Sequence, residues 1–397
     1  HSFSRRQRQM CIRDSLYPGE YLIPIAKKIS DEHGEKFLDK DESDWLDFFK
    51  KESISSIMDI IKSDLKSLEI SHDVFISEKA LLEEGHVNKA YKYLEDKKLL
   101  YKGNTNPPKG SKNDEWSEKK HILFKSKSFG DDEDRVVKKH DGQWTYFMPD
   151  IAYHLNKYER GFIRMINIFG ADHSGYIARM KAAVKAVTNE KANLEIKTCQ
   201  LVRLSRGGKP VKMSKRAGSF ITLKEIVNEV GKDAVRFMMV SRKNDAQLDF
   251  DFEVFKNENN DNPIFYIQYA NARISSLIRN SKEKLGRDIK DKDLINADLT
   301  FLQNENEKKI IFQIANFPKV IEQSVTFMEP HRLSYYLRDL ASSFHQYWNL
   351  KIDNKRIHIL DKSEIDLSLA RVALLFAVSI TIQTGLGLLG IEAIEEL

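Results

Sequence analysis

The sequence has few cysteines, no long apolar run and no glycine-rich phosphate loop, and each shortage excludes a class of protein. Only Cys11 and Cys199 are cysteines among 397 residues, so a disulfide framework is excluded and a reducing, cytoplasmic compartment is expected. The longest apolar run, residues 372–382, is expected to be too short and too polar-flanked to cross a bilayer, so no membrane partner is predicted. No G-x-x-x-x-G-K-[ST] sequence occurs, which argues against a P-loop nucleotide site.

The charges of the chain nearly cancel. There are 64 Lys+Arg against 59 Asp+Glu, a formal net charge of +5, so positive patches are expected to be local. Such patches are compatible with a nucleic-acid partner but do not require one. With 41% hydrophobic and 31% charged residues, the chain is expected to form two or three globular domains.

The first fifteen residues, HSFSRRQRQMCIRDS, are basic but lack the apolar segment of a secretory signal. This string resembles translated sequencing-adapter read-through, so residues 1–15 are excluded from the fold argument as a non-native segment. The native sequence is then expected to enter near Leu16, and the chain is expected to be a fragment of a longer protein.

Residues 16–255 are predicted to form a partial α/β domain. Helical apolar spacing occurs in residues 20–34 and 44–70, and residues 72–101 are predicted to form a short strand followed by a helix. An insertion is expected at about 65–140. Within it, the acidic stretch FGDDEDR, residues 129–135, is interpreted as a solvated turn.

The second half of this domain has the pattern of a nucleotide-binding unit. A strand is predicted at 164–170 and a helix at 176–187, with the polar turn GADHSG between them. Ligands bind at the carboxyl ends of strands in open parallel sheets, so this turn is a candidate site. A further strand is predicted at 195–204 and a helical stretch at 223–242.

Residues 256–397 are predicted to be all-helical, without a repeat of fixed period. Asp261-Asn262-Pro263 has the form of an N-cap followed by proline in the first helical turn. One apolar face is expected on the helix that follows, made of Ile264, Ile267, Ala270, Ile274 and Leu277.

The loop GGKPVKMSKRAGSF, residues 207–220, combines glycines with cationic side chains. A solvated lysine-rich turn is the plainer interpretation of such a loop. Against it, Gly207, Gly208 and Gly218 are expected to let the loop move, and Lys212 and Lys215 flank Met213-Ser214 so that two ammonium groups can converge on one polyanion. The loop also follows a strand of the unit that carries GADHSG.

Residues 212–216, KMSKR, resemble the KMSKS signature of class I aminoacyl-tRNA synthetases. In amino-acid activation a carboxylate attacks the α-phosphate of ATP, and negative charge grows on the departing pyrophosphate. Positioned ammonium groups stabilise that transition state more than the ground state. A mobile loop can supply them after ATP has bound.

Several dispersed stretches together resemble arginyl-tRNA synthetase in particular: FGDDEDRVV, WTYFMPDIAYHLNKYERGF, INIFGADHSGY, VKMSKRAG, NPIFYIQYANARISSL, LRDLASSFHQYWN and GLGLLGIEA. The resemblance runs from Leu16 to the C-terminus. It implies a partial Rossmann-like catalytic domain followed by a helical-bundle anticodon-binding domain. The implied reaction is ATP-dependent ligation of L-arginine to tRNA(Arg) through arginyl-adenylate, with Mg²⁺ as the counter-ion of ATP, by a monomer.

The residues themselves favour an arginine pocket. A guanidinium group is always charged and planar, so a specific site needs a carboxylate and usually an aromatic face. Tyr146 and Asp150 lie four residues apart and face the same side of one helical turn. In the family, the matching Tyr and Asp hold the substrate guanidinium. His154 is interpreted as a packing residue.

The resemblance also implies roles at the other motifs. Asp172 and His173 are expected at the floor of the arginine and ATP sites, where plain structural roles are the alternative. The implied catalytic residues are Lys212, Ser214 and Lys215, and the implied arginine-binding residues are Tyr146, Asp150 and His173. ATP is expected to contact Gly170, Asp172, Val211 and Met213. The tRNA is expected to contact Tyr347, Trp348 and Asn349, and no metal ligand is assigned.

RNA contacts are also suggested by aromatic residues among cationic and amide side chains. These are Tyr335, Tyr336, Tyr347 and Trp348, interleaved with Arg332, Arg338 and Gln346. Core packing is the usual role of aromatics at helical spacing, so only some are expected to contact RNA. Asp233 and Arg236 are expected to brace the helix behind the KMSKS-like loop.

One departure from the family is the lack of an H-x-G-H sequence, the second ATP motif of class I synthetases. The chain as given is therefore expected to be inactive in adenylation while its helical domain folds. Two alternatives stay open: a non-catalytic tRNA-binding protein derived from a synthetase, and another class I synthetase or nucleotidyltransferase. The second would be expected to keep the KMSKS-like loop but not the Tyr146 and Asp150 pair.

Overall fold

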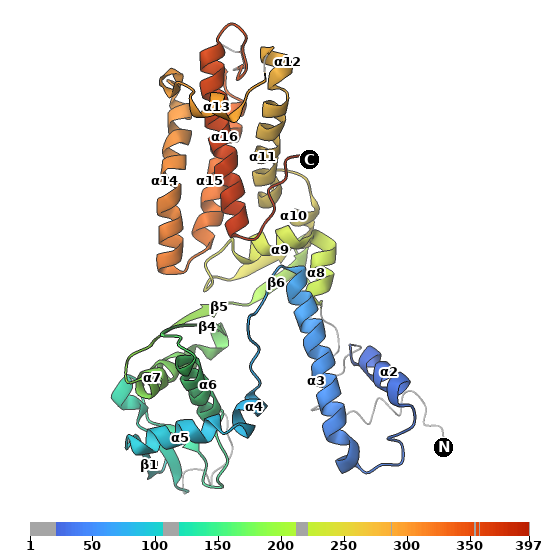
Figure 1. Ribbon diagram of the computed structural model, residues 1–397, viewed down its shortest axis with the longest axis vertical. Coiled ribbons are helices and arrows are strands. Elements are labelled where there is room, and N and C mark those ends of the chain that lie inside the picture. The colour runs from blue at the N-terminus through green and yellow to red at the C-terminus, as the bar shows by residue number, and fades with distance from the viewer. Residues whose placement is uncertain are drawn as a thin grey trace. The chain divides into compact units, whose positions relative to one another are not determined.

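A computed structural model of the chain describes residues 21–105, 119–211, 221–286, 288–352, 355–356 and 358–396. The chain divides into two compact units, and each has its own hydrophobic core. The first unit contains the chain up to residue 71 together with residues 202–243 and 248–397, and the second contains residues 72–201 and 244–247. Figure 1 shows the helices and strands of both units, coloured along the chain. The domain boundary expected at 255/256 falls inside the first unit.

The second unit contains the predicted strand, polar turn and helix. Its elements are α4 (Glu78–Glu83), α5 (His86–Asp96), β1 (Leu100–Gly103), β2 (His121–Phe124), η2 (Ser126–Phe129), β3 (Arg135–Lys138), α6 (Phe147–Glu159), β4 (Arg164–Gly170), η3 (Ala171–Tyr176), α7 (Ile177–Thr188) and β5 (Asn193–Cys199). Strands β1, β2 and β3 form an antiparallel sheet. Strands β4 and β5 are parallel and in register from Arg164 opposite Asn193 to Gly170 opposite Cys199.

Two sequence expectations fail in this unit. The strand expected at the start of residues 72–101 does not form; the segment contains the short helices α4 and α5, which break at Gly85 with a φ of 79°. The strand expected at 195–204 is two strands, because β5 ends at Cys199 and pairs with β4, whereas β6 (Val202–Arg206) belongs to the first unit. An apolar run does not show which sheet each of its halves joins.

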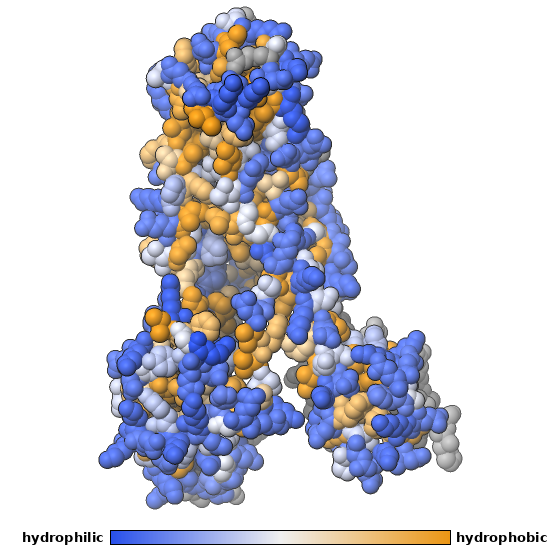
Figure 2. Space-filling model, in the orientation of Figure 1, coloured by the Kyte–Doolittle hydropathy of each residue, from blue (hydrophilic) through white to orange (hydrophobic). Residues whose placement is uncertain are grey.

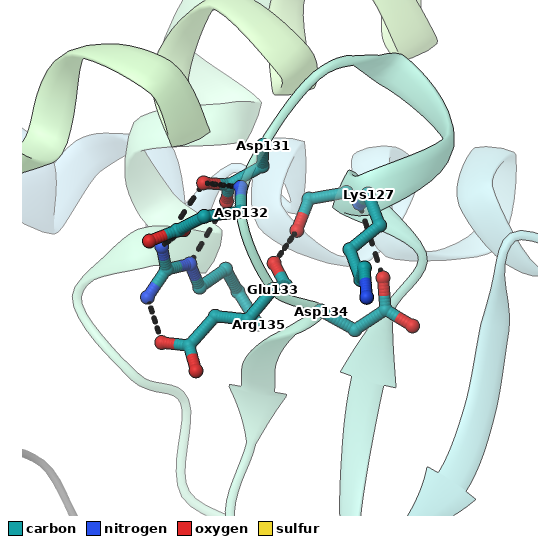
Figure 3. Close-up of polar contacts among 7 residues, drawn as sticks. Lys127, Asp131, Asp132, Glu133, Asp134 and Arg135 are labelled. Atoms are coloured by element: carbon teal, nitrogen blue, oxygen red, sulfur yellow. Dashed lines mark hydrogen bonds and ion pairs between the residues drawn. The ribbon is translucent and has the colours of Figure 1, made fainter.

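The sequence predicts a solvated turn at residues 129–135, but part of this acidic turn is buried. Figure 3 shows the Asp131, Asp132 and Glu133 side chains gathered around the Arg135 guanidinium. The side chain of Asp131 is fully buried, and Arg135 Nε donates to its Oδ2 at 2.8 Å. Burial by itself raises the pKa of Asp131, but hydrogen bonds from Arg135 and Asp132 outweigh it and hold the pKa at about 2. The Asp131–Arg135 ion pair therefore connects the turn to the first residue of β3.

The first unit begins with α2 (Leu22–His33) and α3 (Glu42–Ser67). The helices predicted from the apolar spacing of residues 20–34 and 44–70 are present, but two of the apolar residues of α3, Ile60 and Ile61, are exposed. After these helices, β6 pairs with β8 (Leu248–Asp251) in parallel and with β7 (Lys209–Pro210) in antiparallel fashion. The predicted helical stretch at 223–242 is two helices, α8 (Leu223–Val230) and α9 (Lys232–Met239), because Gly231 adopts a φ of 84° between them.

The remainder of the first unit is helical, as predicted. It comprises α10 (Phe252–Lys256), α11 (Pro263–Arg279), α12 (Ser281–Leu285), α13 (Asp291–Ile295), η4 (Leu299–Phe301), α14 (Glu305–Phe327), α15 (His331–Trp348) and α16 (Ile365–Leu388), with a small β9 (Lys351–Ile352) and β10 (Lys355–Arg356) hairpin. The Asn262 side chain accepts from Phe265 N–H, and Pro263 opens α11, so the N-cap prediction is confirmed. The five predicted apolar positions of α11 are all buried.

Helix α16 corrects the argument against a membrane span. Its 24 residues are long and apolar enough to cross a bilayer by length and composition, so the apolar run is not too short. Half of its most apolar window is buried inside the protein, where α16 packs against α11, α13, α14 and α15. The apolar composition of α16 is accounted for by this packing as a core helix of the bundle.

Helix α9 is fastened to two distant segments by Arg236. Its guanidinium donates to the carbonyl of Leu389 at 2.9 and 2.8 Å, and it also donates to the carbonyl of Leu68. Lys232 on the same helix pairs with Glu69 at 2.6 Å. Arg236 therefore connects α9 to the end of α16 and to the end of α3, a wider role than bracing one helix.

Candidate functional site

A cavity of about 650 Å³ lies in the second unit, at the carboxyl end of β4. Helix α6 forms one wall, and β4 and η3 form the other. The lining residues are Tyr146, Asp150, Tyr153, His154, Lys157, Ile166, Asn167, Ile168, Phe169, His173, Tyr176 and Met180. The structure thus brings the three predicted arginine-binding residues, Tyr146, Asp150 and His173, to one cavity.

Asp150 is the carboxylate of this cavity. Its backbone N–H donates to the Tyr146 carbonyl at 3.4 Å, so the two residues occupy one helical turn as predicted. Burial raises the pKa of Asp150, and a hydrogen bond from Tyr176 Oη to Oδ2 at 2.5 Å partly opposes that rise. A half-desolvated carboxylate of this kind is suited to a cationic ligand, because a nearby positive charge stabilises its ionised form.

Aromatic rings surround this carboxylate. Tyr146, at the N-terminus of α6, is 87% exposed, whereas Tyr176 is half-buried and packs edge-on against Phe147 and Phe169. The Lys157 ammonium lies 4.3 Å from the centroid of the Tyr153 ring. The cavity therefore offers one carboxylate and several π faces, the combination that a planar guanidinium requires.

His154 has a larger role than packing. It is 4% exposed, its Nδ1 lies 2.7 Å from the Asp150 carbonyl, and its Nε2 lies 2.8 Å from Asn167 Nδ2. Burial lowers the pKa of His154 to about 4, so the ring is neutral at physiological pH. Four further residues of the cavity were not predicted from the sequence: Tyr153, Lys157, Asn167 and Tyr176. Tyr153 and Lys157 follow Asp150 at helical spacing, which is a usable signal, but nothing local points to the other two.

The polar turn GADHSG follows β4 as η3. Gly170 is the last residue of β4, and a Cβ there would lie 2.5 Å from Asp172 Oδ1, so a larger residue would displace the exposed Asp172 side chain. Asp172 and His173 are exposed, and His173 Nε2 lies 3.7 Å from Asp172 Oδ2. His173 lines the cavity, and Asp172 stands beside it at the same strand end.

Gly207 and Gly208, the first residues of the KMSKS-like loop, form the tight turn of a hairpin between β6 and β7. Gly207 and Gly208 have φ values of 55° and 76°, and their N–H groups donate to the Asp251 carboxylate at 3.0 and 2.7 Å. Val211 N–H donates to the Leu204 carbonyl at 2.9 Å, and its side chain packs against the core of the first unit. Lys212, Met213, Ser214, Lys215 and Gly218 lie outside the described residues.

Tyr347 does not fit its predicted contact with RNA, because its side chain is fully buried. Its hydroxyl donates to Glu307 Oε1 at 2.8 Å, and Arg371 Nε donates to the same oxygen at 3.0 Å. A base cannot stack on a ring inside the bundle. The next two residues remain candidates, since Asn349 is exposed and Trp348 is half-buried.

Trp348 belongs to an aromatic cluster that the sequence analysis did not single out. The Arg273 guanidinium lies 4.0 Å from the centroid of the Tyr269 ring and 5.8 Å from that of Trp348. Phe265 stacks on Tyr269 with centroids 5.7 Å apart. These side chains are half-exposed, and such rings beside a cation can stack unpaired bases. The spacing of four between these α11 residues was the available signal.

Other apolar side chains are also exposed on the helical bundle. Figure 2 shows hydrophobic residues interspersed with hydrophilic ones on its surface. Phe312 on α14 is 67% exposed, and Tyr335 on α15 is 48% exposed. Tyr336, by contrast, is half-buried and donates to the Gln313 carbonyl at 2.9 Å, so it connects α15 to α14. Of the aromatic residues considered for RNA contact, Tyr335 is therefore accessible, whereas Tyr336 contributes to packing.

Comparison with known families identifies the class of protein to which this fold and site belong. Residues 28–251 match the family model described as tRNA synthetases class I (R), catalytic domain. Residues 267–397 match the DALR anticodon binding domain. The predicted fold class, a class I catalytic domain followed by a helical anticodon-binding domain, is thereby confirmed: the chain has the architecture of a class I aminoacyl-tRNA synthetase.

Within that class, the chain belongs to the arginyl-tRNA synthetase family. It is 49% identical over 97% of its length to an arginine-tRNA ligase of Parvibaculum lavamentivorans and 46% identical, over the same share, to one of Azorhizobium caulinodans. It spans 66% of the length of each of these curated relatives.

Solved structures show the same fold. A structure assigned as an arginyl-tRNA synthetase, from Campylobacter jejuni, superposes with a TM-score of 0.79 and 30% identity, and the match covers 98% of this chain and 80% of that one. The Thermus thermophilus arginyl-tRNA synthetase superposes with a TM-score of 0.66 over 95% of this chain and 67% of that one. At 19% identity, this second likeness concerns the fold alone.

Proposed function

We propose that this chain carries the arginine pocket, the KMSKS-type loop and the anticodon-binding domain of an arginine-tRNA ligase. Such an enzyme uses ATP to form arginyl-adenylate from L-arginine and then transfers arginine to tRNA(Arg). The observation that carries the proposal is the half-buried Asp150 carboxylate in a cavity lined by aromatic rings, in a chain 49% identical to an arginine-tRNA ligase.

Arginine recognition follows from the chemistry of this cavity. The Asp150 carboxylate would accept two parallel hydrogen bonds from the guanidinium, as planar forked donors favour, and Tyr146 would cover its face. His173 lies on the η3 side of the same cavity, where it would contact the remainder of the substrate. A lysine side chain would make one point contact in place of the fork, and neutral citrulline would leave the carboxylate uncompensated.

The proposed activation step depends on groups at two places. Gly170 and Asp172, at the end of β4, would lie beside ATP. Lys212 and Lys215 would stabilise the charge that develops on pyrophosphate, with Ser214 donating a hydrogen bond and Val211 and Met213 lining the nucleotide site. Mg²⁺ would accompany ATP as its counter-ion; in the described part of the chain, no group of three or more His, Cys, Asp or Glu side chains is arranged to hold a metal.

For tRNA(Arg), we propose contacts at the exposed side of α11 and α15. Trp348 and Asn349 would contact the anticodon loop together with Tyr269 and Arg273, since stacking and cation–π contacts suit unpaired bases. We further propose that the protein acts as a cytoplasmic monomer. Because the sequence contains no H-x-G-H motif, the chain as given would bind arginine without forming adenylate at the rate of the complete enzyme.

Calorimetric titration of the chain with L-arginine, L-lysine and L-citrulline tests the proposal. Arginine should bind in preference to both analogues, and Asp150→Asn should weaken arginine binding by about 100-fold, because the guanidinium would lose its half-buried carboxylate partner. The matched control is Asp96→Asn, an exposed carboxylate of the same unit, which should leave binding unchanged. Equal affinity for arginine and citrulline would exclude the proposed pocket.

A further inference from the structure

Three side chains beside Asp150 form a hydrogen-bond chain with a single direction. Lys157 Nζ lies 3.3 Å from Asn167 Oδ1, Asn167 Nδ2 lies 2.8 Å from His154 Nε2, and His154 Nδ1 lies 2.7 Å from the Asp150 carbonyl oxygen. Lys157 and His154 come from α6, and Asn167 comes from β4. The chain therefore joins the two walls of the cavity.

The chemistry at its two ends fixes the direction of the chain. An ammonium group only donates, so the oxygen of the Asn167 amide must face Lys157 and its NH₂ must face His154. A carbonyl only accepts, so His154 Nδ1 must carry the proton that goes to Asp150. With Nδ1 protonated and Nε2 accepting, the neutral ring satisfies every partner, whereas an imidazolium would confront the Asn167 NH₂ with a second donor.

Tyr176 holds the carboxylate itself. Its hydroxyl donates to Asp150 Oδ2 at 2.5 Å from η3, the opposite wall of the cavity. The ring is half-buried and packs against Phe147 and Phe169, so the hydroxyl has little freedom to move away. Asp150 is thus restrained at two points: its main-chain carbonyl by His154 and its side chain by Tyr176.

We propose that Tyr176 and the chain Lys157–Asn167–His154 are positioning residues that hold Asp150 in the orientation that receives a guanidinium. This inference rests on the proposed arginine pocket and adds to it residues outside the predicted site. Fixing the carboxylate before the ligand arrives removes the cost of ordering it during binding. The Tyr176 donor also favours the ionised carboxylate, the form that a cation binds.

The first test is Tyr176→Phe, which removes one hydroxyl and keeps the ring. Arginine affinity should fall about tenfold, the usual effect of losing a hydrogen bond to a charged group. The pH below which arginine no longer binds should rise, because burial then raises the pKa of Asp150 without the opposing Tyr176 donor. The other titratable side chains that line the cavity with Asp150 are His173 on η3 and, at the start of or within α6, Tyr146, Tyr153, His154 and Lys157.

The matched control is Tyr158→Phe, a half-buried tyrosine on α6 that does not line the cavity. It should change neither the arginine affinity nor its pH profile. If Tyr176→Phe behaves like this control, the positioning role of Tyr176 is refuted. A merely structural loss would lower the thermal stability without moving the pH profile, and that result also counts against the proposal.

The second test is Asn167→Asp, read by NMR titration of the His154 ring in the chain without ligand. A carboxylate at position 167 only accepts, so His154 Nε2 must then donate while Nδ1 still donates to Asp150. The pKa of His154 should rise from about 4 to above the ordinary histidine value of about 6.5. An unchanged His154 titration in the folded variant would refute the chain as described.

The two failures are distinguishable. If the unmodified chain binds arginine no better than citrulline, the proposed pocket fails, while the His154 titration still tests the hydrogen-bond chain. If arginine binds selectively but Tyr176→Phe leaves its affinity and pH profile unchanged and Asn167→Asp leaves the His154 titration unchanged, the pocket stands and the positioning proposal falls.

Discussion

The burial of Tyr347 gives a prediction that separates folding from RNA binding. Its hydroxyl donates to Glu307 Oε1, and Glu307 is 1% exposed. Tyr347→Phe removes one hydrogen bond to a buried charge, which is worth about 1.5 to 3 kcal/mol. The lower end is expected, because Glu307 keeps the Arg371 Nε donor at 3.0 Å and the Asn304 N–H donor at 3.0 Å.

A loss of about 1.5 kcal/mol should lower the melting temperature of the helical part by about 3 to 6 °C. Glu307→Gln should cost more, about 3 to 5 kcal/mol, because the Arg371 side chain, 14% exposed, then lacks its carboxylate. Thermal denaturation followed by circular dichroism measures both variants. Because both side chains are buried, neither substitution should alter the surface of the folded bundle at temperatures below the melting transition.

Binding of tRNA(Arg), measured by fluorescence anisotropy at low temperature, should therefore be unchanged in Tyr347→Phe. Trp348→Leu, which keeps apolar volume but removes an aromatic face beside Arg273, should weaken the binding by about tenfold. The reasoning is refuted if Tyr347→Phe weakens tRNA binding while its melting temperature stays that of the unmodified chain.

Two further predictions concern the scaffold. Gly390→Ala would place a Cβ 2.1 Å from Arg236 Nη2 at a φ of 68°, so thermal denaturation should show a loss of about 1 to 3 kcal/mol. Gly387→Ala is the control, because a Cβ there meets nothing within 4 Å and should not destabilise the fold. Equal effects of the two substitutions would contradict the tight packing of Arg236 against the end of α16. Hydrogen bonds from Arg135 hold the pKa of Asp131 at about 2 against an ordinary 3.8, so its contribution, up to about 2 kcal/mol, is present above about pH 4 and is lost as the pH falls to about 2. Asp131→Asn should flatten the acid dependence of the unfolding free energy in that window, and an unchanged dependence would count against the Arg135 hydrogen bonds as the cause of the low pKa.

Local patterns in the sequence predicted much of the architecture. The N-cap at Asn262 and the apolar face of α11 were correct, because a cap and a helical stripe each depend on residues within a few positions of one another. The strand that ends at Gly170 was also correct, and the parallel sheet brings the turn after it to the predicted cavity. The family motifs predicted the two domain types, since a family resemblance implies a three-dimensional arrangement that local spacing alone does not encode.

Only the tertiary structure decided which side chains are accessible and what the glycines do. Gly207 and Gly208 suggested mobility by composition, yet Asp251, more than forty residues away, binds both of their N–H groups. Tyr347 was predicted to contact RNA, yet its hydroxyl donates to Glu307, forty residues earlier, in the core. A sequence pattern reports the periodicity of one segment, whereas burial and hydrogen-bond pairing depend on segments that meet only when the chain folds.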